Sequence, residues 1–185
     1  MIPTMSKVDR RILKTQDAIK KAMIELMSEK NFDDITIQNI CDRANVNRGT
    51  IYFHYQDKFD LLDKIIESHI NELGEMCEWA CEMDWKDATL VFFEYFGRNY
   101  LFFSTMLASK GAPFFRSRFL QFLIQAFKDE VDLTKEESSN LSEQVILQFM
   151  GTAYVGVLEW WLTNGMPYPP HVMAEQVGTL LDRSV

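Results

Sequence analysis

The sequence predicts an all-α protein of about nine helices, and three observations lead to that fold class. Apolar residues recur at helical spacing along most of the 185 residues, no alternating strand pattern appears, and helix caps or glycine and proline stops separate the apolar runs. With 47% apolar residues the chain can bury a sizeable core in one or two domains. The predicted helices span, approximately, residues 8–28, 36–44, 47–54, 57–81, 86–97, 99–108, 113–131, 136–163 and 170–182.

The first predicted helix follows a loose tail of residues 1–8. Its apolar stripe consists of Ile12, Ile19, Ala22, Met23 and Leu26. Such a stripe is typical of a helix that packs against its neighbours, so we expect a supporting role. The link at residues 31–35 carries Phe32, which we expect to fill the core beside it.

Three capping residues between positions 36 and 57 indicate short helices that pack on each other. Thr36 precedes an apolar series and can cap the free N–H groups of the helix that follows. Asn47 is a second cap, and residues 44–46 leave room for the short turn of a DNA-binding helix pair. Asp57 is a third cap and opens a long helix that belongs to both halves of the molecule.

The middle helix of this group has an unusual composition. Its polar, small or amphipathic residues are Arg48, Gly49, Thr50, Tyr52 and His54, which leave Ile51 and little else for the core. A small structural corner of two helices is the alternative interpretation. The polar content favours a helix whose remaining faces contact solvent or a partner, whereas Phe53 and Tyr55 are expected to pack.

The remaining helices are delimited by stops and loaded with aromatic residues. Asn164-Gly165 with Pro167 ends one helix, and Pro169-Pro170 begins the last. Twelve aromatic residues fall between positions 92 and 127. Most must be ordinary core, but a cavity lined by rings is also what an apolar or aromatic ligand requires. The candidate pocket residues are Phe92, Phe96, Tyr100, Phe103, Phe119, Phe122 and Tyr154.

Net charge −8 argues against DNA binding until its distribution is considered. Residues 1–60 carry ten basic and nine acidic side chains, whereas residues 61–185 carry nine and eighteen. The acidic excess is therefore separated from the helix pair. Phosphate binding depends on local positive potential and on helix N-termini, so the whole-chain charge does not exclude a DNA partner.

The segment from Thr36 to Leu62 resembles the DNA-binding motif of TetR-family bacterial transcriptional regulators. The matching positions are Thr36-Ile37, Ile40-Cys41, Ala44, Val46-Asn47, Gly49-Thr50, Ile51-Tyr52, His54-Tyr55, Asp57-Lys58 and Leu61-Leu62. The resemblance implies a helix-turn-helix domain at residues 1–57 and a helical effector-binding and dimerisation domain at residues 58–185. It also implies a homodimeric repressor that binds a palindromic operator on double-stranded DNA and is released by a small apolar or aromatic effector. An activator, a regulator without a ligand, and an interaction module that has lost DNA binding are the alternatives.

The resemblance also implies roles for individual residues. Arg48, Gly49 and Thr50 would face the major groove, where an arginine can donate two hydrogen bonds to a guanine edge. Phosphate contacts would come from Tyr52, His54 and Lys58, while Thr36 and Asn47 would present helix N-termini to the backbone.

Close helix approach is suggested near the end of the chain. Gly151, Thr152 and Gly156 are small residues in a helix interior, where each glycine costs about 1 kcal/mol against alanine, and Trp160 and Trp161 add apolar area. We interpret Gly151, Thr152, Gly156 and Trp160 as a dimer interface, with burial inside one subunit as the alternative. Similar family members dimerise through their last two helices.

Catalysis, cofactors and membranes are not expected. The chain lacks a nucleophile with a base, a phosphate-binding glycine loop, or metal-ligand spacing, so no cofactor or metal is predicted. A thiol or metal site formed by Cys77, Cys81 and His69 is a minor alternative to core thiols. Three cysteines give no disulfide framework, and no signal core or membrane span is apparent. We therefore expect a cytoplasmic protein with reduced thiols and no membrane partner.

Overall fold

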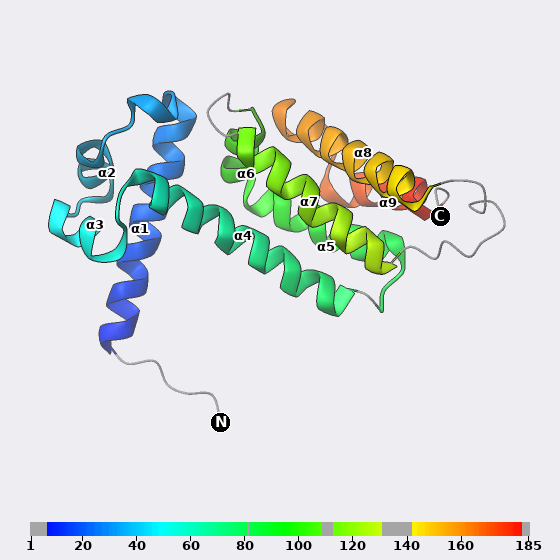
Figure 1. Cartoon of the computed structure of the whole chain (residues 1–185), viewed down its shortest axis with the longest axis horizontal. Coiled ribbons are helices and arrows are strands. Elements are labelled where there is room, and N and C mark those ends of the chain that lie inside the picture. Colours follow the sequence, from blue (N-terminus) through cyan, green and yellow to red (C-terminus); the bar gives the residue numbers. More distant parts are fainter. Residues whose placement is uncertain (1–6, 81, 109–112, 131–141, 183–185) are drawn as a thin grey trace. The chain divides into compact units, whose positions relative to one another are not determined.

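A computed structural model describes residues 7–80, 82–108, 113–130 and 142–182, which form nine α-helices and one 3-10 turn, with no strand in these ranges (Figure 1). The all-helical prediction is confirmed. The chain divides into two compact units, Met1–Ser68 and His69–Val185. The sequence suggested a division at residues 57–58. The division by contacts lies later because Leu61, Leu62 and Ile65, in the first turns of the next helix, are buried.

The first unit contains α1 (Lys7–Glu29), the 3-10 turn η1 (Phe32–Asp34), α2 (Ile37–Ala44), α3 (Arg48–His54) and the start of α4 (Lys58–Ala80). Its core gathers one apolar stripe from each helix. From α1 these are Ile19, Met23 and Leu26, from α2 Ile40 and Cys41, and from α3 Ile51. Phe32 of η1 is 4% exposed and fills the core, as the sequence predicted. Since α3 contributes one buried residue, most of its surface is left free.

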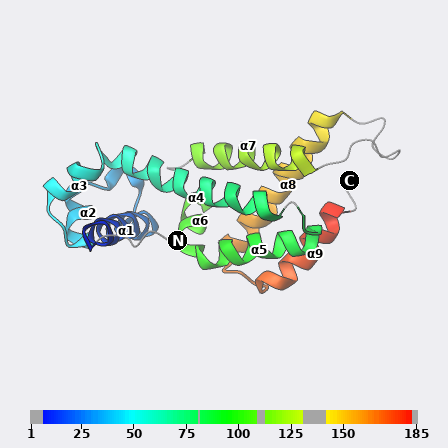
Figure 2. The same ribbon diagram turned by 90° about the horizontal axis from the view of Figure 1, so that it is seen from below.

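The second unit contains the end of α4 and five further helices: α5 (Trp85–Arg98), α6 (Tyr100–Ala108), α7 (Pro113–Glu130), α8 (Glu143–Thr163) and α9 (Pro170–Asp182). α5 packs most extensively on α9, and α8 packs on both α7 and α6 (Figure 2). The predicted helix at residues 136–163 begins at Glu143 in the structure, and residues 136–141 lie outside the described ranges.

Close approach of α5 and α9 depends on Gly178. A Cβ atom at this position would lie 2.9 Å from the Lys86 Cα and 3.0 Å from the Trp85 carbonyl oxygen. Backbone atoms cannot move aside as a flexible side chain can, so glycine allows the beginning of α5 to rest on α9. This contact fixes the position of Trp85 and the residues that follow it.

Aromatic rings fill the centre of the second unit. The fully buried rings include Phe93, Phe96, Phe103, Phe115 and Phe119. Phe96 and Phe103 meet edge to face with centroids 4.9 Å apart, and Phe115 and Phe119 are stacked at 5.8 Å. Such offset and edge-to-face pairs are the favoured geometries of aromatic contacts. Most of the aromatic run is therefore core, as expected.

The end of α8 is fixed by the predicted stop. Gly165 has φ +70° and Met166 has φ 55°, so the chain leaves the helix through two left-handed residues. Trp161 is fully buried, and its Nε1 donates a 2.7 Å hydrogen bond to the Tyr168 carbonyl oxygen after the stop. Trp161 therefore anchors the turn inside the unit, instead of adding to an exposed apolar face as the sequence suggested.

Candidate nucleic-acid interface and cavity

The helix pair α2–α3 is built by the caps that the sequence predicted. Thr36 accepts a hydrogen bond from the Asn39 N–H, and the Asn39 side chain accepts one from the Thr36 N–H, so the two form a capping box. Asn47 accepts from the Thr50 N–H at 2.8 Å. Between the helices Asn45 adopts the left-handed conformation, with φ 53°, and ends α2. These bonds fix the turn between the two helices.

The outer face of α3 presents polar and aromatic groups. Arg48 and Gly49 are exposed, Thr50 is half-buried, and Tyr52 is 56% exposed. The Arg48 Nε donates a 2.9 Å hydrogen bond to Gln38 Oε1 of α2. This bond orients the guanidinium and leaves its two terminal nitrogens without a hydrogen bond to another described residue. Sequence reasoning missed Gln38, because nothing in the pattern shows which exposed α2 residue faces α3.

His54 and Phe53 lie at the end of α3. His54 is half-buried, with its Nδ1 3.4 Å from the Gln16 Nε2 of α1. Phe53 was expected to pack, but it is 77% exposed and meets the His54 ring in an edge-to-face contact with centroids 4.9 Å apart. Helical periodicity explains the difference, because Ile51 already occupies the inward face. Tyr55, at 3% exposure, does pack as predicted.

Lys58 has a structural environment that the sequence did not reveal. Its Nζ donates three hydrogen bonds to backbone carbonyl oxygens, at 3.0 Å to Phe32, 2.9 Å to Asp33 and 2.9 Å to Ile35. The ammonium also lies 4.7 Å from the centre of the Phe32 ring. Lys58 thus ties η1 to the start of α4, and its three N–H donors are all used. A phosphate contact by Lys58 stays a prediction and would require it to give up one of these bonds.

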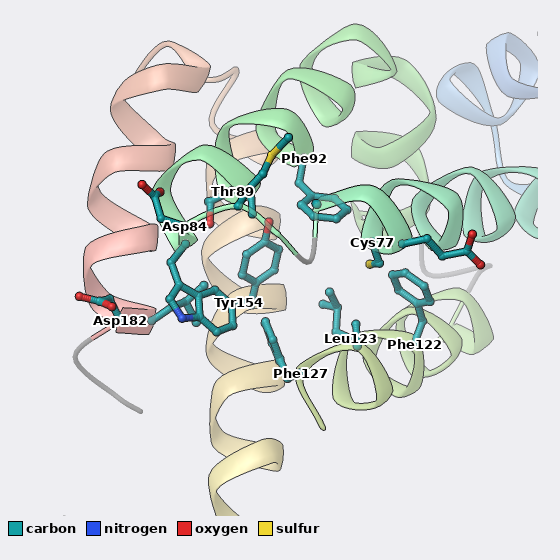
Figure 3. Close-up of a pocket in the computed structure, with 16 residues that line it drawn as sticks. Cys77, Asp84, Thr89, Phe92, Phe122, Leu123, Phe127, Tyr154 and Asp182 are labelled. Carbon is teal, nitrogen blue, oxygen red and sulfur yellow. The ribbon is translucent and has the colours of Figure 1, made fainter. Parts of the chain in front are cut away.

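A cavity of about 490 Å³ opens in the second unit between α4, α5, α7, α8 and α9 (Figure 3). This volume lies in the range of small-molecule sites. Apolar and aromatic side chains dominate its wall. The described lining residues are Cys77, Glu78, Ala80, Met83, Asp84, Trp85, Ala88, Thr89, Phe92, Phe122, Leu123, Ala126, Phe127, Tyr154, Leu181 and Asp182.

Only some of the predicted pocket residues line this cavity. Phe92, Phe122 and Tyr154 do. Phe96, Phe103 and Phe119 belong instead to the buried ring cluster, and Tyr100 is half-buried on α6 away from the cavity wall. In sequence these rings are indistinguishable, because the arrangement of α7 and α8 decides which of them pack and which face the space.

Sequence reasoning missed the polar members of the cavity. Thr89 is 3% exposed, and Trp85 and Asp84 come from the first turn of α5 and its cap. A threonine inside an otherwise apolar helix face, between Trp85 and Phe92, was the available signal. Two acids that lie among the aromatic residues in sequence, Glu94 and Glu159, are outside the cavity: Glu94 is exposed and Glu159 pairs with Arg116 at 3.3 Å.

The outer face of α8 carries an exposed apolar stripe. It consists of Val145, Phe149, Thr152, Gly156 and Trp160, of which Val145 is 63%, Phe149 67% and Trp160 46% exposed. A Cβ atom on Gly156 would meet no atom of the described residues within 4 Å. Gly151, in contrast, is buried, and a Cβ atom there would lie 3.0 Å from Leu120 Cδ1 of α7. Its small size serves packing inside the unit and not the exposed face to which the sequence assigned it.

α8 is also, among the described helices, the one long and apolar enough to cross a membrane, yet half of its most apolar window is buried. That combination is typical of a core helix in a globular protein. No cluster of three potential metal ligands occurs in the described ranges. Cys81 lies outside them, and His69 stacks on Phe102 at 3.9 Å.

An exposed second helix, capped and joined by a short turn to the first, defines a helix-turn-helix DNA-binding protein. Comparisons with known proteins identify the family of helix-turn-helix proteins to which it belongs. Residues 19–65 match the model of bacterial regulatory proteins of the tetR family, and residues 83–183 match that of a transcriptional regulator C-terminal region. The chain belongs to the TetR family and is a DNA-binding transcription regulator. The relatives and solved structures that match are named as transcription regulators, which are not enzymes.

Relatives and solved structures agree with this assignment. The uncharacterized regulator YxbF of Bacillus subtilis is 24% identical over 95% of this chain, and the chain spans 47% of its length. DhaS of Lactococcus lactis, the dhaKLM operon activator, is 22% identical over 82% of this chain and 81% of its own. A TetR regulator from Streptococcus agalactiae shares 25% identity and a TM-score of 0.66, covering 94% of this chain and 96% of that one.

Proposed function

We propose that this chain is a homodimeric repressor that binds a palindromic operator through α3 and is released by a small molecule held in the second unit. The outer face of α3 carries the proposal. A helix that buries only Ile51 while it exposes Arg48 and Tyr52 is suited to a polar partner rather than to a protein core.

Within this proposal Arg48, Gly49 and Thr50 face the base edges. The exposed Gly49 allows the backbone to approach the groove closely. Tyr52 and His54 contact phosphates, and the caps Thr36 and Asn47 present helix N-termini to the backbone on either side. Arg48 is the main source of base preference, since a guanidinium held by Gln38 retains the two terminal nitrogens needed for bidentate recognition of guanine.

The dimer is supported by the exposed stripe on α8. Phe149 and Trp160 are large apolar side chains on one face, between which lie the exposed Thr152 and Gly156, and no described residue lies within 4 Å of a Cβ atom on Gly156. Contiguous apolar surface of this kind marks interaction sites. In α9, Leu180 is 60% exposed and adds apolar area from the other terminal helix. Sedimentation at micromolar concentration tests the assignment: a dimer is expected, and a monomer that still binds a full operator would contradict it.

Ligand release is supported by the cavity. Its wall includes Cys77 and Ala80 at the end of α4, whose first turns pack in the DNA-binding unit. In this proposal a ligand that prefers one position of α4 changes the spacing of two α3 helices. It acts through its difference in affinity between the two states, and a change from 1:99 to 99:1 needs about 5.5 kcal/mol of that difference.

The test is a binding assay on DNA from upstream of the chain's own gene and of neighbouring genes. Fluorescence anisotropy with labelled fragments should show a specific complex that competes poorly with unrelated DNA. Footprinting should show two half-sites related by a two-fold axis, with centres about 34 to 36 Å or a multiple apart. Equal affinity for all fragments at physiological salt would contradict sequence-specific regulation.

An activator is the second candidate, because the relative DhaS is named a transcriptional activator. BepR of Brucella suis, 34% identical over 34% of this chain, is named a repressor. A promoter–reporter fusion with and without the intact gene separates the two. Higher expression in the deletion strain supports repression, and lower expression supports activation.

A further inference from the structure

Two largely buried residues, Tyr154 and Thr89, place hydroxyl groups at the cavity of the second unit. Tyr154 is 6% exposed and Thr89 is 3% exposed, and both line the cavity. Neither hydroxyl makes a hydrogen bond to another residue in the described ranges. Figure 3 shows the Tyr154 ring reaching in from α8, with its hydroxyl oxygen on the side of α5. Both hydroxyls are therefore available to pair with a molecule in the cavity.

The surrounding wall limits what that partner is. Most of the lining is apolar, with aromatic rings from Phe92, Phe122 and Phe127. Planar apolar molecules fit between such rings in offset or edge-to-face contact. The volume of about 490 Å³ accommodates a fused ring system or a molecule of similar bulk.

The charges at the cavity are of one sign. The described lining contains the carboxylates Glu78, Asp84 and Asp182, and no lysine, arginine or histidine. Nothing on the described wall neutralises an anionic ligand, and the carboxylates repel one. Burial, and to a smaller extent the neighbouring Cys77, raises the pKa of Tyr154 far above its ordinary value. The phenol therefore remains protonated and can both donate and accept a hydrogen bond.

We propose that the cavity binds an aromatic molecule without negative charge that carries one hydroxyl or similar hydrogen-bonding group, which pairs with Tyr154 and Thr89. The proposal rests on the proposed function only in treating this cavity as the effector site. It adds the chemical class: a ring-containing ligand without negative charge, with a polar group on the α5 side, and not a carboxylate or a phosphate ester.

Three probes of the same shape test the class: 2-naphthol, naphthalene and 2-naphthoate. Isothermal titration of the full chain should show 2-naphthol binding at least tenfold more tightly than 2-naphthoate. Tyr154→Phe keeps the ring and removes the hydroxyl, so it should weaken 2-naphthol about three- to tenfold and leave naphthalene unchanged. Thr89→Val should act in the same direction. Tyr100→Phe, outside the cavity wall, is the matched control and should change neither.

Stability measurements separate binding effects from folding defects. Because both hydroxyls lack a partner in the described part of the unliganded chain, Tyr154→Phe and Thr89→Val should unfold at or above the wild-type temperature. The proposal is overturned if no probe binds, if 2-naphthoate binds as tightly as 2-naphthol, or if neither variant changes the ratio of naphthol to naphthalene affinity. These readouts do not involve DNA, so a failure of operator binding or release would count against the proposed function alone.

Discussion

Replacing Lys58 with methionine separates a structural role from a DNA contact. Lys58→Met keeps most of the aliphatic stem but removes the ammonium that donates to the Phe32, Asp33 and Ile35 carbonyls. Two of these bonds are part-buried and one is exposed. A hydrogen bond to a charged group contributes about 1.5–3 kcal/mol, and the exposed one contributes little. The variant should therefore lose about 3 kcal/mol in the free energy of unfolding of the first unit.

Urea denaturation followed by two probes measures this loss. All four tryptophans lie in the second unit, so their fluorescence reports that unit, while circular dichroism at 222 nm reports both. Lys58→Met should shift the circular dichroism transition to lower urea. Lys14→Met is the control, because Lys14 is an exposed α1 residue that makes no ion pair with another described residue, and it should change stability by less than about 0.5 kcal/mol.

The alternative outcome is equally specific. If Lys58 contacts a phosphate in the DNA complex, Lys58→Met, assayed under conditions where it remains folded, should lose affinity for all DNA sequences alike. The slope of log affinity against log salt concentration should also fall in magnitude by about 0.9. An unchanged unfolding free energy together with that change in slope would refute the structural role. An unchanged slope with a large loss of stability would remove Lys58 from the DNA contacts.

Three further substitutions test other parts of the structure. Arg48→Ala should reduce the magnitude of the free energy of binding to the cognate operator by about 1–3 kcal/mol and relax base preference at one position. Competition between operator variants measures this preference, and undiminished discrimination would rule out base readout by Arg48. Asn47→Ala removes the side chain that accepts a hydrogen bond from the Thr50 N–H, so it should lower the free energy of unfolding by about 1 kcal/mol, measured by urea denaturation. A change near zero would mean that water replaces the cap. Gly151→Val should lower the free energy of unfolding by about 1–3 kcal/mol through contact with Leu120. Gly156→Val should leave the unfolding free energy of the monomer nearly unchanged and weaken self-association in sedimentation. Equal effects of the two variants on stability would contradict the assignment of the two faces.

Most of the fold was predictable because its boundaries are local. Thr36, Asn47 and Asp57 cap their helices with their own side chains, and each bond spans two or three residues. The stop at Gly165 is likewise a property of a few neighbouring residues. The face of α3 was predictable for a related reason, since a helix with a single apolar core position has few ways to pack.

The environment of Lys58 was not predictable, because it depends on contacts distant in sequence. The carbonyls that hold its ammonium come from residues 32–35, more than twenty positions earlier, and they become available only because η1 turns there. The cavity has the same origin. Phe96 and Phe92 have equal apolar character, and the packing of α5 on its neighbours places one at 1% exposure in the core and the other on the cavity wall.

The two glycines of α8 show how one residue type serves two purposes in a single helix. Gly151 and Gly156 are five positions apart, which places them about 140° apart around the helix axis. One faces α7, where a Cβ atom would touch Leu120 and Ile124, and the other faces open space beside Phe149 and Trp160. The close contact at Gly151 accounts for its lack of a side chain within one subunit. No contact with the described residues of the subunit accounts for Gly156, and a second α8 at that position would.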